Sequence, residues 1–140
     1  MSSVLVFNLP CLVKFANEKI KGPGMFHEKC PCIGVLRDGK IAAVCVYDKY
    51  DGTGITMNIA SDGSKRWMTK QFLRACFEYA FNGLKVRRVT GLVRKDQPDV
   101  VKFDEHLGFR VEGVVREGDD DGCDLVLLGM LRKECRWIKQ

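Results

Sequence analysis

Four consecutive residues, Gly63 to Arg66, have the types that can hold a phosphate group. They lie between an apolar run, Ile55 to Ala60, that predicts a strand and a periodic run, Met68 to Phe81, that predicts a helix. A helix N-terminus has unpaired N–H groups and a partial positive charge, so it favours phosphate. Lys65 and Arg66 would add two cations beside those N–H groups. The same residues also fit an ordinary capped helix with exposed bases, and both interpretations stay open.

Charge is distributed unevenly along a chain whose net charge is +5. Nine Lys or Arg residues and one acid lie between Lys65 and Lys95. Ten acids and three bases follow between Asp96 and Asp124. This pattern indicates either two solvated faces or an anion site followed by a surface that attracts cations.

The cysteines and the N-terminal sequence indicate in which cellular compartment the protein occurs and whether it binds a metal. Seven cysteines, an odd number, with no export signal before them, argue against a disulfide framework. Cys30-Pro31-Cys32 has no second ligand pair and the chain has two histidines, so we expect no metal site. No uncharged apolar run reaches the roughly 18 residues of a membrane helix. We therefore expect a cytoplasmic protein without a membrane segment.

The element order predicts an α+β domain over residues 1–140. An N-terminal strand and helix occupy 1–31, and a core occupies 32–137. The expected helices are Leu9 to Ile20, Met68 to Phe81 and Pro98 to Leu107. The expected strands are Ser3 to Phe7, Cys32 to Arg37, Lys40 to Tyr47, Ile55 to Ala60, Val86 to Val93, Phe109 to Arg116 and Asp124 to Leu131. The helix between Ile55–Ala60 and Val86–Val93 suggests that these two strands are parallel.

Leu107-Gly108-Phe109, followed by Glu112-Gly113, resembles the end of the GNAT (GCN5-related N-acetyltransferase) fold. The element order from Cys32 to Trp137 matches that family as well. The closing segment, Asp124 to Trp137, is similar to small phage-encoded or bacterial members of the family. If the chain is phage-encoded, the expected location is the cytoplasm of the host. The resemblance implies a mixed, mostly antiparallel central sheet flanked by helices. It also implies a V-shaped splay between Ile55–Ala60 and Val86–Val93.

The resemblance implies acetyl-CoA as a co-substrate and no metal. In the family the pantetheine arm lies in the splay and the pyrophosphate lies on the following loop, here Ser64 to Thr69. Trp67 and Thr69 stand where the family usually has small residues, and Lys65 and Arg66 can compensate by charge. The expected cofactor-binding residues are Asn58, Ile59, Ala60, Ser64, Lys65, Arg66, Trp67, Met68, Thr69, Gln97 and Phe103.

Direct acetyl transfer to an amine needs a proton acceptor and often an acid for the CoA thiolate. In the family that acid is frequently a Tyr four residues before the Gly of Leu-Gly-Phe, and Asp104 has that place here. An Asp is ionised at pH 7 unless burial raises its pKa. Asn58 stands where some members have Glu, and it cannot act as a base. The catalytic candidates are Tyr47, Asp104, His106 and Glu112.

Two functions follow from these patterns. The first is an acetyl-CoA-dependent N-acetyltransferase that acts on a primary amine of a protein, a small amine or an aminoacyl-tRNA. The acidic residues Asp119, Asp120, Asp121 and Asp124 would then attract a cationic acceptor, or they form a solvated hairpin turn. The alternative is a catalytically inactive GNAT-fold protein that binds a host protein or nucleic acid. The protein is expected to be a monomer or a homodimer.

Overall fold

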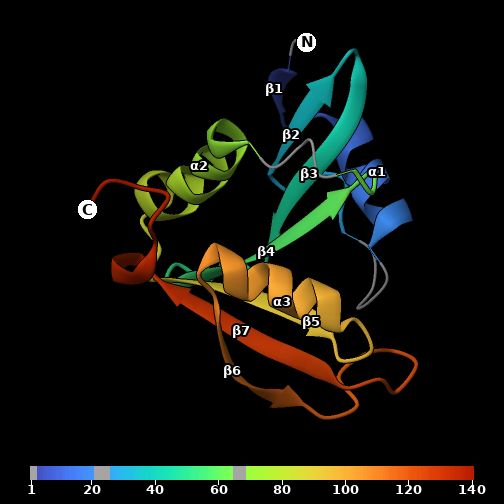
Figure 1. The fold of residues 1–140 in the computed structure, drawn as a ribbon, viewed down its shortest axis with the longest axis vertical. Coiled ribbons are helices and arrows are strands. Elements are labelled where there is room, and N and C mark those ends of the chain that lie inside the picture. The colour runs from blue at the N-terminus through green and yellow to red at the C-terminus, as the bar shows by residue number, and fades with distance from the viewer. Residues whose placement is uncertain (1–2, 21–25, 65–68) are drawn as a thin grey trace.

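One sheet organises the chain. The computed structural model describes residues 3–20, 26–64 and 69–140, and its strands follow the spatial order β1-β2-β3-β4-β5-β7-β6 (Figure 1). All neighbouring strands are antiparallel except β4 and β5, which are parallel. The mostly antiparallel α+β fold expected from the sequence is confirmed. The strands are β1 Ser3–Phe7, β2 Cys32–Arg37, β3 Lys40–Asp48, β4 Gly54–Ser61, β5 Arg88–Arg94, β6 Arg110–Val115 and β7 Leu125–Leu131.

Three α-helices accompany the sheet in the described ranges: α1 Pro10–Lys19, α2 Lys70–Glu78 and α3 Pro98–Leu107. Proline is the first residue of α1 and α3. It has no N–H group, and an N–H in the first turn would have no partner inside the helix, so no hydrogen bond is lost. Gly108 ends α3 with φ of 118°, a conformation that glycine adopts without strain. None of these helices is long and apolar enough to cross a membrane.

The expected helix from Met68 to Phe81 differs from the observed one at its end. Its α-helical part stops at Glu78, and a π-helical turn, Tyr79–Gly83, follows. The N–H of Leu84 donates to the Tyr79 carbonyl at 2.9 Å, five residues back, which widens this last turn. Met68 lies outside the described residues.

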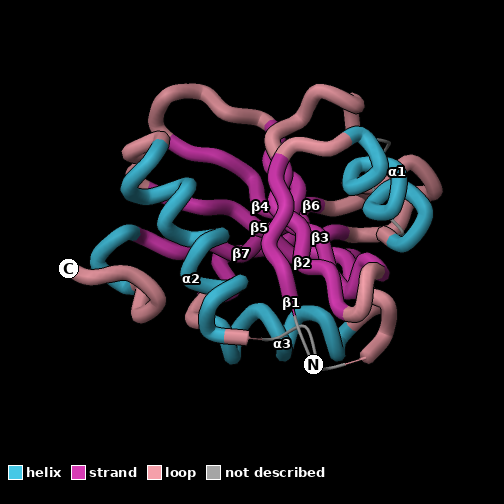
Figure 2. Tube along the Cα trace, turned by 90° about the horizontal axis from the view of Figure 1, so that it is seen from above, coloured by secondary structure: helices cyan, strands magenta, loops and turns pink. Residues whose placement is uncertain are grey.

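Strand alternation divides the core into two layers. On β3, Ala43, Cys45 and Tyr47 pack in the cluster that contains the buried face of α2, whereas Val44 and Val46 pack with α1. Figure 2 shows these two helices on either side of the strands. Because successive side chains of a strand point to opposite faces, β3 carries apolar residues on both.

The pairing of β4 with β5 ends early. Gly54, Ile55 and Thr56 lie opposite Arg88, Val89 and Thr90, and no further pairs follow along these two strands. Each strand continues nonetheless, because β3 pairs with β4 up to Ser61 and β7 pairs with β5 up to Arg94. The two strands diverge in Figure 1. This is the V-shaped splay that the resemblance to the GNAT fold implies.

Candidate active site

A cavity of about 410 Å³ fills the gap between the diverging strands. Its walls are the last five residues of β4, the last four of β5, the end of α1 and one flank of α3. Residues from both faces of the sheet line it, so the cavity reaches from the α1 side to the α3 side. The individual lining residues include Lys19, Ile20, Phe26, Gln97, Asp99, Val100, Phe103, Asp104 and Phe109.

The inner edge of the cavity is backbone. Beyond Thr56 on β4 and Thr90 on β5, N–H and C=O groups that face the gap have no strand partner. Such groups are strong donors and acceptors that need partners when water is excluded. An extended ligand that carries amide groups can therefore pair with this edge as an added strand does.

The structure brings five of the predicted cofactor-binding residues to this cavity: Asn58, Ile59, Ala60, Gln97 and Phe103. The Asn58 side-chain amide donates to the Val46 carbonyl and to Asp48 Oδ1, both at 3.1 Å. These bonds hold the Asn58 side chain to β3. The Asn58 position therefore presents a fixed surface to the cavity.

The predicted pyrophosphate loop is only partly described. Lys65, Arg66, Trp67 and Met68 lie outside the described residues. At its two ends, the Ser64 N–H donates to Asp62 Oδ1 at 2.9 Å, and Thr69 Oγ1 accepts from the Phe72 N–H at 3.1 Å. Thr69 is thus the N-cap of α2, and its hydroxyl proton is still available to a ligand.

Asp104 is the one catalytic candidate of the four that lines the cavity. Its Oδ2 lies 3.6 Å from the place that a Cβ would occupy on Gly91 of β5, so the missing side chain leaves room for this carboxyl. Within the described ranges, no ion pair or hydrogen bond involves its side-chain oxygens. Burial raises the pKa of Asp104 from 3.8 to about 7. At neutral pH this carboxyl therefore exists in both protonation states.

The other three candidates lie elsewhere. Tyr47 is fully buried on the α2 face of the sheet, where its hydroxyl donates to the Cys76 carbonyl at 2.6 Å and burial raises its pKa. His106 is exposed near the end of α3. Glu112 on β6 is ion-paired with Arg88 at 2.8 Å. None of the three side chains faces the cavity, because each belongs to another surface of the fold.

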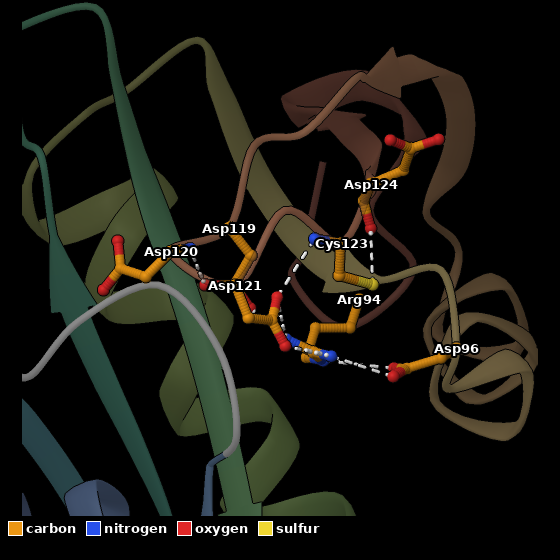
Figure 3. Close-up of polar contacts among 7 residues, drawn as sticks. All are labelled: Arg94, Asp96, Asp119, Asp120, Asp121, Cys123 and Asp124. Carbon is orange, nitrogen blue, oxygen red and sulfur yellow. Dashed lines mark hydrogen bonds and ion pairs between the residues drawn. The ribbon is translucent and has the colours of Figure 1, made fainter.

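Arg94 at the end of β5 is a cavity residue that sequence reasoning did not identify. Its side chain is 6% exposed, and its guanidinium contacts Asp96 and Asp121, each at 2.9 Å, and also Asp119 (Figure 3). These carboxylates hold the pKa of Arg94 above its usual value, and the guanidinium lowers that of Asp121. In the acidic turn between β6 and β7, the carboxylates of Asp119 and Asp121 bind Arg94 of β5. These two carboxylates are therefore not free to attract a ligand, and the turn is more than a solvated loop.

The chain also lacks a clustered metal site in its described ranges, where no three His, Cys, Asp or Glu residues are placed to hold an ion. All seven cysteines are free thiols. The groups that line the cavity include the half-buried Asp104 carboxyl, the backbone amides of β4 and β5, and the side chains that surround them.

No protein-family model matches this sequence, and no curated protein sequence matches it. Solved structures match its fold. Ard1 from Thermoplasma volcanium aligns over 94% of this chain and 98% of its own, with TM-score 0.70 and 14% identity. An acetyltransferase of the GNAT family from Streptococcus pneumoniae aligns over 93% and 99%, with TM-score 0.69 and 14% identity. Spermidine N-acetyltransferase from Vibrio cholerae, in complex with CoA and spermine, aligns over 74% and 66%, with TM-score 0.63 and 16% identity.

These likenesses show that the chain has the GNAT fold, as its element order and the Leu107-Gly108-Phe109 segment predict. Two of the three structures are described as enzymes: the Streptococcus pneumoniae structure as an acetyltransferase and the Vibrio cholerae structure as a spermidine N-acetyltransferase. At identities of 14–16%, the likeness establishes the arrangement of the strands and helices.

The raised pKa of Asp104 predicts a pH-dependent effect of Asp104→Asn on stability. Well below pH 3.8 both the folded and unfolded carboxyls are protonated. Between pH 4 and 7 the unfolded carboxyl ionises first, so this group destabilises the native state increasingly as pH rises. Asparagine carries no such penalty. Urea unfolding should show the variant gaining about 2 kcal/mol relative to wild type between pH 4.5 and pH 8, a value reduced for solvent screening at an open cavity. A difference that stays constant over this range would contradict the burial of Asp104.

The place of Tyr47 predicts a structural role. Tyr47→Phe removes the buried hydroxyl and leaves the Cys76 carbonyl without that donor, at a cost of about 1–2 kcal/mol in unfolding free energy. Tyr50→Phe is the matched control, because Tyr50 is 54% exposed and should change stability by less than about 0.5 kcal/mol. Neither Tyr47 nor Tyr50 lines the cavity, so neither substitution should change ligand binding there. A loss of ligand affinity in Tyr47→Phe without loss of stability would place Tyr47 in the site.

Proposed function

We propose that this chain transfers an acetyl group from acetyl-CoA directly to a primary amine. The observation that carries the proposal is the early end of β4–β5 pairing, which opens a cavity with a backbone edge on one side and Asp104 on the other. A GNAT-family acetyltransferase and a spermidine N-acetyltransferase are among the solved structures with this fold, and the latter holds CoA and spermine.

The cavity residues fit the parts of acetyl-CoA. The pantetheine arm carries amides, which match the unpaired N–H and C=O groups along Asn58, Ile59 and Ala60 of β4. Phe103 and Gln97 would form the opposing wall. The pyrophosphate would lie at the N-terminal end of α2, on the segment from Ser64 to Thr69 that includes Lys65, Arg66, Trp67 and Met68.

The proposed chemistry uses one carboxyl. Bound acetyl-CoA supplies an activated acetyl carbon, to which the amine nitrogen bonds as the carbon–sulfur bond breaks. Protonated Asp104 gives its proton to the departing sulfur, and the proton lost by the nitrogen restores it. Backbone N–H groups at the splay would stabilise negative charge on the carbonyl oxygen during the transfer.

Calorimetry on the reduced protein, with acetyl-CoA and CoA as ligands, tests binding, and mass spectrometry of an amine panel tests transfer. The panel contains spermidine, a lysine peptide, a peptide with a free N-terminus and an aminoacyl-tRNA. We expect micromolar binding of acetyl-CoA and one acetylated class. If millimolar acetyl-CoA does not bind, the chain is a non-catalytic binding protein on this fold.

Asp104→Asn should lower kcat at least tenfold and leave KM for acetyl-CoA nearly unchanged, since asparagine fills the same space and cannot give up a proton. The wild-type rate should fall as pH rises above about 7, where the protonated form is lost. Asp38→Asn, in an exposed turn, is the matched control and should retain full activity. An unchanged kcat in Asp104→Asn would remove Asp104 from the reaction.

A further inference from the structure

A second groove, of about 820 Å³, lies at the opposite end of β5 from the cavity between β4 and β5. It is formed by the turn that ends α2, the chain that enters β5 and the chain that leaves β7. Four of its lining residues are cations, Lys85, Arg87, Arg132 and Lys133, and none of the described residues that line it is Asp or Glu. We call this feature the basic groove.

Strand register places like charges opposite each other in the basic groove. Arg88 pairs with Leu131, and beyond that pair the Arg132 N–H donates to the Arg87 carbonyl at 3.2 Å. Arg87 and Arg132 are therefore neighbours on two antiparallel chains. Like charges in that position repel and lower stability. A bound anion would remove this repulsion.

Carboxylates of the described residues do not compensate these four cations. Their neighbour on β5, Arg88, has Glu112 as an ion-pair partner, and Arg94 at the far end has three carboxylates. By contrast, no ion pair involves the four residues of the basic groove in the described ranges. The uncompensated positive charge is thus concentrated at one end of β5.

One of the four cations is held in place by the fold. Arg132 Nη1 donates to the Phe81 carbonyl at 2.7 Å, and Gln140 Nε2 donates to the Arg132 carbonyl at 2.9 Å. The first bond satisfies a carbonyl of the π-helical turn Tyr79–Gly83, which follows α2. The C-terminal end of a helix carries partial negative charge, so it favours a nearby cation. That helix-end effect explains Arg132, but Lys85, Arg87 and Lys133 are exposed and have no such partner.

We propose that the basic groove binds the phosphodiester backbone of a nucleic acid, without reading its base sequence. Four cations along an open groove can contact several phosphates, and a volume of about 820 Å³ exceeds what one phosphate needs. The lining aromatic residue, Phe81, is 1% exposed, so it offers no face on which a base can stack. Contacts to phosphate alone position a nucleic acid and carry no sequence information.

The charges at the two ends of β5 would orient the bound strand. Asp96, Asp119 and Asp121 surround Arg94 at one end, and the basic groove lies at the other, roughly 20 Å away along seven residues of strand. The acidic end repels phosphate. The nucleic-acid backbone would therefore lie across the start of β5. Arg88 and Arg94 add little to this surface, because each forms ion pairs with carboxylates.

Fluorescence anisotropy with a labelled 12-nucleotide single-stranded RNA, without acetyl-CoA, tests this site independently of acetyl transfer. Four phosphate contacts predict a slope near −3 for log affinity against log KCl, or about 50-fold weaker binding at 200 mM than at 50 mM KCl. The variant Lys85→Gln/Arg87→Gln/Lys133→Gln should bind at least tenfold more weakly at 50 mM KCl and with a slope near −1. Arg132 is left intact because it supports the α2 turn.

The matched control is Lys29→Gln/Lys40→Gln/Lys49→Gln, which removes the same charge from exposed lysines outside both cavities. It should bind RNA within about twofold of wild type. Thermal melting of both triple variants checks that each is folded. Equal loss in the two variants, no binding at 50 mM KCl, or equal competition by an oligo-glutamate of the same charge would each overturn the proposal.

Discussion

The early end of the β4–β5 pairing is the constraint on which the rest of the site depends. After three residue pairs, each strand is held only by its outer neighbour, β3 for β4 and β7 for β5. Backbone groups that lose a strand partner must find another partner or water. The sheet therefore has unpaired strand edges in its interior. In most sheets such unpaired edges occur only on the outermost strands. A cavity and a row of free donors and acceptors follow directly from it.

The residues around the splay have distinct physical roles. Gly91 has no side chain where Asp104 approaches, so the carboxyl is buried against β5 and its pKa rises to about 7. Arg94 binds carboxylates of the β6–β7 turn and so ties this turn to the end of β5. Removing the Arg94 side chain would leave Asp119 buried without its cation, which is the costly way to break such a cluster. Ion pairs of Arg94 thus hold one side of the site, and the packing of Asp104 against the β5 backbone at Gly91 forms the other.

Local patterns predicted the elements, because apolar periodicity acts over a few neighbouring residues. The positions of side chains in space were harder to predict from the sequence. Tyr47 shares strand parity with Ala43 and Cys45, and this parity is the signal that places it in the core and not in the cavity. The basic groove was not predictable, since Arg87 and Arg132 are 45 positions apart and meet only through the β5–β7 register. The Arg94 cluster has the same origin.

Backbone hydrogen exchange, followed by NMR in the presence and absence of acetyl-CoA, tests most directly whether β4 accepts an extended ligand as a strand accepts its neighbour. Alternate amides of β4 already bond to β3, so the informative amides are those between Met57 and Ser61 that face β5. If acetyl-CoA binds in the splay, it slows exchange at these amides and leaves exchange in β2 and β6 unchanged. Unchanged exchange along Met57–Ser61 in ligand-saturated protein would contradict binding in the splay.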